Sequence, residues 1–267
     1  MRFDATGKVE LDHIYTQPDP RSYFSSLRGL EYQIPQLAKP HFTALVEEYR
    51  ATTGIDTPTV LDIGSSYGIN AALLRCDLTM EDLYDRYDLD ARSSAEVLAD
   101  DQELVRERGK AIPARFVGLD ISSPALSYAT AAGLLDDAVL ADLERAEPTP
   151  EQQRKLADVD LVISTGSLGY VGAPTLARVV QASGAPWMAH FVLRMFPFDE
   201  IEASLAQLGY ETVRADGLFR QRRFISAEEQ SRVLDTLADV GVDPSGLEDG
   251  GWFYAQLYLS KRPIERT

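Results

Sequence analysis

Val60-Leu61-Asp62-Ile63-Gly64-Ser65-Ser66-Tyr67-Gly68 decides the fold of this 267-residue chain. The apolar run at 59–63 is typical of a short buried strand, and a helical pattern at 69–74 follows directly. Gly64 allows a sharp turn and close approach to a ligand, and Gly68 allows the next helix to pack down on the sheet. Free backbone N–H groups at that helix start face the same place. The stretch therefore predicts an α/β unit whose turn is either a ligand-binding loop or a plain tight connection.

Strand and helix alternate along most of the chain beyond this stretch. Near-continuous apolar strands indicate burial on both faces, as in a parallel sheet with helices on both sides. We therefore predict an α/β fold with a doubly wound, mostly parallel sheet of seven strands, the last of them antiparallel. Strands are expected at 59–63, 114–120, 138–142, 160–164, 187–195, 211–213 and 252–259, and helices at 69–74, 123–133, 175–183, 199–208 and 227–240.

Two further parts are expected to flank this sheet. Residues 1–50 mix prolines with aromatic residues, which predicts an N-terminal helical cap of short helices and elbows, with helical spacing from His41. Residues 51–267 then form the sheet domain. Its segment 77–110 contains eleven acidic and five basic residues, which predicts a helical insertion of one or two solvated helices after the first strand–helix unit. We interpret this insertion as a solubilising ornament rather than a substrate gate, and the basic stretch 220–223 as a turn whose arginines pair with nearby carboxylates.

Composition and charge exclude several classes of protein. A chain with 45% hydrophobic and 25% charged residues is typical of a globular protein, and a net charge of −16 argues against a nucleic-acid partner. Cys76 is the single cysteine and there are three histidines, so neither an internal disulfide nor a metal site is expected. No apolar run approaches the roughly 20 residues of a spanning helix, so no membrane partner is expected. The expected location is the cytoplasm, and a homodimer stays open.

Acidic residues also stand at the ends of the next two predicted strands. Asp120 could accept both hydroxyl protons of a ribose, or it could cap the following helix. Asp142 could accept the exocyclic amino group of an adenine that Leu143 covers, or it could be a solvent-facing turn acid. With Asp62, these residues place acids at three successive strand ends, where parallel sheets bind ligands. The set favours a nucleoside site.

Four stretches, at 60–68, 117–122, 141–144 and 160–166, resemble the class I S-adenosylmethionine-dependent methyltransferases, a Rossmann-like family. The resemblance implies that the glycine-rich turn holds the methionine part of S-adenosylmethionine, and that the second and third acids hold its ribose and its adenine. The cofactor-binding residues implied in this way are Asp62, Gly64, Ser65, Ser66, Gly68, Asp120, Ile121, Asp142, Leu143, Thr165 and Gly166.

Two features depart from the family pattern. Ser66 stands where the family's middle glycine usually lies, so the turn is expected to be slightly displaced. Asp120 follows Gly68 by 52 residues where about twenty are usual, and the insertion at 77–110 accounts for the excess. The rival cofactor is a nicotinamide dinucleotide, as in an NAD(P)-dependent oxidoreductase. Its Gly-x-Gly-x-x-Gly pattern does not fit glycines at 64 and 68 alone.

Methyl transfer mainly requires alignment of donor and acceptor and exclusion of water, so the catalytic residue stays unknown. His190 lies in a predicted strand and is expected in the core, while His13 and His41 in the cap are weak candidates for a general base. The segment after 160–164 lacks the Asn-Pro-Pro-aromatic sequence with which the family's nucleic-acid methyltransferases hold a flipped base. These features favour O- or N-methylation of a small molecule, in the biosynthesis of a specialised metabolite.

A pocket for that acceptor is expected under the cap. If its arginines face the pocket, an anionic or carboxylate-bearing acceptor follows, because guanidinium groups pair bidentately with carboxylates. A second class of function stays open: a non-catalytic S-adenosylmethionine-binding or scaffold protein that uses the insertion or the cap as a contact surface. The residues expected to line the acceptor pocket are Tyr15, Arg28, Tyr32, Tyr170 and Arg194, with Arg21 beside them.

Overall fold

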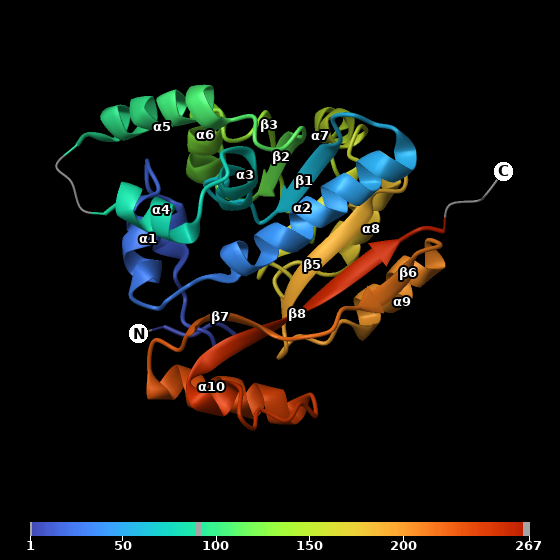
Figure 1. The fold of residues 1–267 in the computed structure, drawn as a ribbon. Helices are drawn as coiled ribbons and strands as arrows, with labels where there is room; N and C mark the ends of the chain where they lie inside the picture. Colours follow the sequence, from blue (N-terminus) through green and yellow to red (C-terminus); the bar gives the residue numbers. More distant parts are fainter. Residues whose placement is uncertain (1, 89–91, 264–267) are drawn as a thin grey trace.

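A central sheet runs through this computed structural model, which describes residues 2–88 and 92–263 (Figure 1). Its strands are β1 (Thr59–Ile63), β2 (Arg115–Asp120), β3 (Asp137–Leu140), β4 (Leu161–Thr165), β5 (Trp187–Leu193), β6 (Glu211–Arg214), β7 (Phe219–Arg223) and β8 (Trp252–Lys261). The order is β3-β2-β1-β4-β5-β8-β6, and β7 also pairs with β8. β1 to β5 are parallel, whereas β8 runs antiparallel to β5, β6 and β7. The predicted doubly wound, mostly parallel sheet is confirmed.

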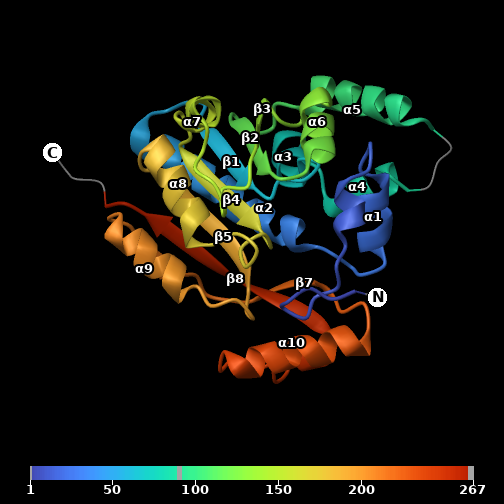
Figure 2. The same cartoon turned by 180° about the vertical axis from the view of Figure 1, so that it is seen from behind.

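Helices cover both faces of this sheet, as Figures 1 and 2 show. One face carries α2 (Ile34–Thr53), α3 (Ile69–Arg75) and α6 (Ser123–Ala131), and the other carries α7 (Pro150–Leu156), α8 (Ala173–Ser183) and α9 (Asp199–Gln207). Every residue of β1 is buried between the two layers, which explains its apolar sequence. Asp62, near the end of that strand, is therefore an exception that needs a reason.

The N-terminal region differs in part from the expected short helices and elbows. A 3-10 turn, η1 (Asp12–Tyr15), and α1 (Arg21–Arg28) are short, but α2 has 20 residues and begins seven residues before His41. Pro40 lies inside α2, where it lacks the N–H that would bond back along the helix. Burial of the apolar face of α2 on the sheet outweighs that loss. The boundary expected after residue 50 falls within this helix.

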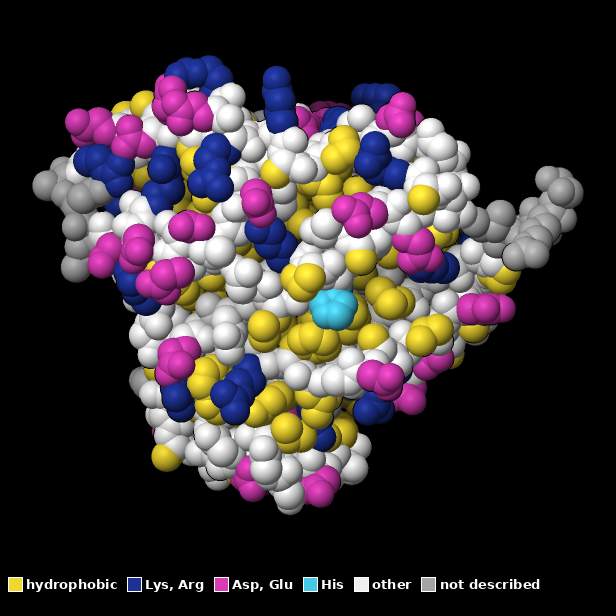
Figure 3. Space-filling model, in the orientation of Figure 1, with side chains coloured by type: hydrophobic (Ala, Val, Ile, Leu, Met, Phe, Trp, Pro, Cys, Tyr) yellow, Lys and Arg dark blue, Asp and Glu magenta, His cyan; other side chains and the backbone are white. Residues whose placement is uncertain are grey.

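The acidic insertion forms two helices, α4 (Met80–Arg86) and α5 (Ser94–Arg108), as predicted. Charges of both signs alternate over its outer surface in Figure 3. Its inner surface is apolar, however, and packs with α1 in one cluster through Met80, Leu83, Tyr84, Tyr87 and Val97. The interpretation as a solubilising ornament is therefore wrong: the insertion shares a core with the cap.

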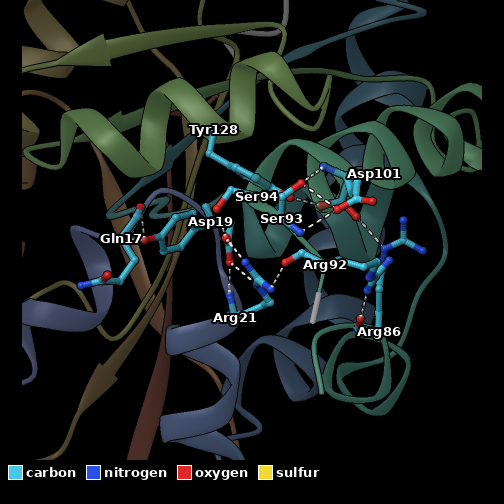
Figure 4. A network of polar contacts seen from close by, with 11 residues as sticks. Gln17, Asp19, Arg21, Arg86, Arg92, Ser93, Ser94, Asp101 and Tyr128 are labelled. Atoms are coloured by element: carbon cyan, nitrogen blue, oxygen red, sulfur yellow. Dashed lines mark hydrogen bonds and ion pairs between the residues drawn. The ribbon is translucent and has the colours of Figure 1, made fainter. Parts of the chain in front are cut away.

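A buried polar network fastens this insertion in place (Figure 4). Asp101 on α5 is 1% exposed and accepts hydrogen bonds of 2.6 Å from Tyr87, from Tyr128 on α6 and from Arg86. Nearby, Asp19 of the cap accepts a hydrogen bond from Ser94 at the start of α5. Cap, insertion and sheet domain are thus held together by short polar contacts.

The C-terminal third contains the strand that sequence patterning misses. Residues 220–223, expected as a turn, form most of β7, which pairs with the first half of β8. Arg222 is buried and forms an ion pair with Glu229 on α10 (Ala227–Asp239), and Arg223 pairs with Glu31, so the expected carboxylate partners are found. A short 3-10 turn, η2 (Glu248–Gly250), precedes β8. Within 2–88 and 92–263, none of the helices is long and apolar enough to cross a membrane.

Candidate functional site

The first element of the site is the carboxylate of Asp62 near the end of β1. It is 1% exposed, and its hydrogen bonds come from the Asn70 side-chain amide, at 3.1 and 3.2 Å. No lysine, arginine or histidine of the described chain forms an ion pair with it. Burial, reinforced by the charge of Asp120 and opposed by the Asn70 hydrogen bonds, raises the pKa of Asp62 to about 7. The chain thus keeps a buried acid without supplying the cation that would stabilise its charge.

The glycine-rich turn brings the second acid to the same place. Ser66 has a φ of 49°, in the left-handed region that favours glycine, which gives the physical reason why glycine suits this position. In that conformation its N–H donates to Asp120 Oδ2 at 2.9 Å. Asp120 Oδ1 accepts a second bond, from the Ser122 N–H at 2.8 Å. Ser122, not Asp120, caps α6 through its own hydroxyl, so the capping alternative for Asp120 is wrong.

Unused polar atoms surround this turn. Ser65 and Ser66 are buried, yet neither hydroxyl has a hydrogen-bond partner in the described structure, and the same holds for Asn70 Oδ1. Buried polar atoms are nearly always paired, so a cluster of unpaired ones suggests that a ligand completes them. Gly64 is exposed with a φ of 73°, and a Cβ there would lie 2.6 Å from Ser167 Cβ. Glycine is thus required for the turn to pass the β4 loop.

The third acid lies at the neighbouring edge of the sheet but is less enclosed. Asp142 comes two residues after β3, is 40% exposed and accepts from the Glu144 N–H at 3.2 Å. Leu143 is buried in the apolar cluster on the α8 face, so it offers little surface to a ring. Ile121 is 74% exposed and directly follows Asp120. At this edge Ile121 and Leu140, which is 49% exposed at the end of β3, are apolar side chains available to cover a base.

The loop after β4 forms the opposite wall. Thr165 Oγ1 accepts from Asn70 Nδ2 at 3.2 Å, which links this loop to Asp62. Gly166 has a φ of 75°, and a Cβ there would lie 2.4 Å from Gln221 Nε2 of β7. The loop is therefore enclosed between the glycine-rich turn and β7. Gln221, which sequence patterning placed in a surface turn, faces the predicted site instead.

Tyrosines of the cap cover this wall. Tyr32 packs edge-to-face on Tyr23 with ring centroids 6.3 Å apart, and burial raises its pKa well above the usual value, opposed in part by Tyr23 and Thr165. Tyr15 packs edge-to-face on Tyr23 with ring centroids 5.8 Å apart, and the charge of Asp120 contributes to its raised pKa after burial. Both residues expected from the sequence therefore lie beside the strand-end site.

Hydrogen bonds hold the cap over the glycine-rich turn and the loop that follows β2. The Tyr67 hydroxyl of the glycine-rich turn accepts from the Gln17 N–H and bonds to the carbonyls of Ile14 and Gln17. The Ser122 hydroxyl donates to the Tyr15 carbonyl. The position of the cap therefore depends on both loops, a link that no local pattern in the sequence indicates.

The arginines expected in the pocket are used elsewhere. Arg28 pairs at the surface with Glu81, Asp85 and Asp88 of the insertion region. Its assignment to the acceptor pocket is wrong because the charges facing it belong to α4 and the turn that follows.

Arg194 and Arg21 are committed in the same way. Arg194 donates to Glu248 at 2.6 Å and lines a hollow of about 460 Å³ with Phe196 and Tyr258. Arg21 is bound to Asp19. Both arginines are thus paired with the chain's own acids, and the expected role of Arg194 toward an anionic acceptor stays a prediction.

The remaining expected residues divide between core and rim. His190 is fully buried, bonds to Ser164 through Nδ1 at 2.8 Å, and burial lowers its pKa to about 3, as expected of a core residue. His41 packs on Phe191 and Phe219 away from the acids. Tyr170 is 51% exposed at the rim, where its hydroxyl donates to Asp4 at 2.6 Å.

A comparison with known proteins finds similar chains among the solved structures. No family model matches the chain, and no curated protein matches it. Among solved structures, the plantazolicin methyltransferase BpumL in complex with SAH is 12% identical, with a TM-score of 0.44, covering 94% of this chain and 93% of its own. A TehB-like SAM-dependent methyltransferase from Corynebacterium glutamicum is 15% identical, with a TM-score of 0.40, covering 80% and 85%. The [4+2]-cyclase SpnF is 14% identical, with a TM-score of 0.39, covering 83% and 81%.

Likenesses at these values do not determine chemistry. The function proposed below therefore rests on the residues of this chain.

Proposed function

We propose that this protein is a methyltransferase that binds S-adenosylmethionine at the carboxyl ends of β1 and β2 and methylates a small-molecule acceptor. The observation that carries the proposal is Asp62, a buried carboxylate that has no cationic partner among the described residues and adjoins unpaired hydroxyls. S-adenosylmethionine carries the cationic ammonium and sulfonium that such a site lacks. The resemblance of the glycine-rich turn and of the acids after it to the methyltransferase pattern supports the same cofactor.

Asp62 also argues against a dinucleotide. A pyrophosphate on the glycine-rich turn would bring negative charge toward a buried acid, and like charges in a low-dielectric site repel strongly. A zwitterionic amino-acid group on the turn would place its ammonium toward the acid instead. The electrostatics of the turn therefore favour S-adenosylmethionine over NAD(P).

Each residue then has a definite task. Asp62 binds the ammonium of the methionine part of S-adenosylmethionine. The Ser65 and Ser66 hydroxyls are available to the carboxylate of that same part. Asp120 accepts one N–H on each oxygen and keeps free lone pairs for two ribose hydroxyls. When bound, S-adenosylmethionine supplies a methyl group activated by the sulfonium. Thr165 and Tyr32 border the acceptor side, where alignment and exclusion of water are the chain's contribution.

Calorimetric titration tests this proposal. We expect the wild-type chain to bind S-adenosylmethionine and not NAD or NADP, and Asp120→Asn to bind it about 10- to 100-fold more weakly. Asp158→Asn, at an exposed position, is the matched control and should bind like the wild type. Absence of binding by a folded wild-type chain, or equal binding by Asp120→Asn, would contradict the proposal.

Turnover separates an enzyme from a binding or scaffold protein. S-adenosylhomocysteine release should be screened against a panel of small hydroxylated and amino compounds. Release that depends on one compound identifies an enzyme and its acceptor. Cofactor binding without release against any compound favours the scaffold, for which the charged outer surface of the insertion is the candidate contact surface.

A further inference from the structure

Lys8 is a largely buried lysine without an acid partner among the described residues. The residue is 8% exposed, and its ammonium, which keeps some contact with solvent, forms neither an ion pair nor a hydrogen bond with any described residue. It faces three aromatic rings instead: Nζ lies 4.7 Å from the ring centroid of Tyr170, 5.9 Å from that of Phe253 and 6.0 Å from that of Phe196. Rings attract a cation but cannot replace three hydrogen-bond acceptors.

The carboxylates nearest to Lys8 are already committed. Glu229 Oε1 accepts from Arg222 and from the Val9 N–H, and Oε2 accepts from Arg222 and from the Ile225 N–H. Asp4 Oδ1 accepts from Thr6 and from the Lys8 N–H, and Oδ2 accepts from Tyr170. In a chain with 16 more acids than bases, Lys8 therefore has no acid of its own.

Such an arrangement is costly for folding. Burial, reinforced by the charge of Arg222 and opposed by Asp4 and Glu229, lowers the pKa of Lys8 to about 8. A methionine of similar length would fill the same aromatic box without this penalty. The tight N-terminal turn nevertheless holds the lysine firmly, because the Val9 N–H and the Thr6 carbonyl bond to α10. Burial therefore disfavours the charged form of Lys8, and the aromatic rings compensate it only in part.

Lys8 lies next to the acceptor side of the proposed site. Tyr170, which forms one wall of the box, belongs to the loop that begins with Thr165 and Gly166. Phe196, a second wall, packs on Tyr170 with centroids 6.2 Å apart. On β7, Arg222 directly follows Gln221, whose amide lies against Gly166. The box and the loop where the methyl group would be delivered thus share Tyr170.

We propose that the Lys8 ammonium, framed by Tyr170, Phe196 and Phe253, is a subsite for a carboxylate group of the acceptor molecule. This inference deepens the proposed function and rests on it for the identity of the reaction. It replaces the expectation based on Arg28 and Arg194, which are paired with the chain's own acids. A carboxylate would supply the acceptors that the ammonium lacks, and the rings would hold an aromatic or aliphatic body beside it.

Paired acid and amide probes test the subsite. Formate, acetate and benzoate are compared with formamide, acetamide and benzamide by thermal shift and calorimetry, with and without saturating S-adenosylhomocysteine. We expect each acid to bind about tenfold or more tightly than its amide, because a hydrogen-bonded charge pair is worth at least that factor. Lys8→Met should remove the preference, Lys8→Arg should retain part of it, and Lys110→Met, at an exposed lysine, should retain all of it.

Stability gives a second, independent readout. Lys8→Met should melt about 2–4 °C higher than the wild type, because an unpaired buried charge is replaced by an apolar side chain of similar size. A lower melting temperature, or equal binding of acids and amides by the wild type, would overturn the inference. Neither result depends on the cofactor: a wild type that prefers acids but does not bind S-adenosylmethionine would refute the proposed function alone.

Discussion

Glu229 and Asp62 are both buried carboxylates, but their hydrogen-bond and charge partners differ. Glu229 is fully buried and receives four hydrogen bonds, two of them from Arg222. Burial opposes its ionisation, but Arg222 and the backbone N–H groups hold the pKa of Glu229 below its usual value. Asp62 is equally buried, and its bonds come from one neutral amide.

The difference separates a structural acid from a binding acid. A carboxylate that folding must stabilise is supplied with a cation, as Glu229 is. We propose that Asp62 is left without a cation because a cationic ligand completes it, and burial without such a cation raises its pKa. Lys8 repeats the second pattern with the opposite charge.

The largest expected effect concerns the structural acid. Glu229→Ala leaves Arg222 buried without its partner and frees the Val9 and Ile225 N–H groups. We expect the free energy of unfolding to fall by about 3–5 kcal/mol, measured by urea denaturation. Glu228→Ala, the adjacent exposed acid that pairs with Arg232, is the matched control and should cost about 0.3–0.5 kcal/mol. Equal losses of unfolding free energy in Glu229→Ala and Glu228→Ala would contradict the structural role of Glu229.

The next effect concerns the binding acid. Asp62→Asn removes the charge and keeps the shape, so S-adenosylmethionine should bind about 10- to 100-fold more weakly in calorimetry. The melting temperature should stay unchanged or rise, because no cation of the described chain loses a partner. A destabilised Asp62→Asn with normal affinity would assign Asp62 to the structural class instead.

A pH series sharpens the same comparison. Cofactor affinity should increase by up to about tenfold per pH unit below pH 7 and level off above it, because the cationic ligand requires ionised Asp62. The contribution of Asp62 to folding stability changes with pH in the opposite direction. Since the folded chain raises the pKa of Asp62, the stabilising contribution of its protonated form is present below about pH 4 and lost as pH rises through 7. Asp62→Asn should remove this pH dependence from both the cofactor affinity and the folding stability. An affinity that is flat from pH 5 to 8 in the wild type would exclude the role.

The binding side of the comparison could largely be predicted from the sequence, because its information is local. The strand, the turn and the helix start all fall within residues 59–74, and strand ends that are consecutive in sequence meet at one edge of a parallel sheet. The placement of Asp62 and Asp120 follows from that rule. Their roles in cofactor binding remain predictions.

The acceptor side could not be predicted in the same way, because its contacts join distant segments. Arg28 is neutralised by α4 more than 50 residues away, and Arg194 by Glu248. β7 was missed because its sequence, Phe-Arg-Gln-Arg-Arg, is polar, and its buried arginine depends on an acid supplied by the next helix. The rings that surround Lys8 come from positions 170, 196 and 253, far from it in the sequence.

The smallest expected effect concerns Ser66, whose backbone conformation affects the fold and whose hydroxyl is available to a ligand. Its left-handed backbone costs an L-residue about 1–2 kcal/mol, and glycine removes that strain but gains about 0.5–1 kcal/mol of unfolded-state entropy. Ser66→Gly should therefore raise the free energy of unfolding by about 0–1.5 kcal/mol, whereas Ser66→Val should lower it. If the unpaired Ser66 hydroxyl serves the cofactor, Ser66→Gly should also weaken S-adenosylmethionine binding several-fold. A stabilised variant with weaker binding would place Ser66 with Asp62, as a residue kept for the ligand at the expense of the fold. A destabilised variant with unchanged binding would make it part of the scaffold.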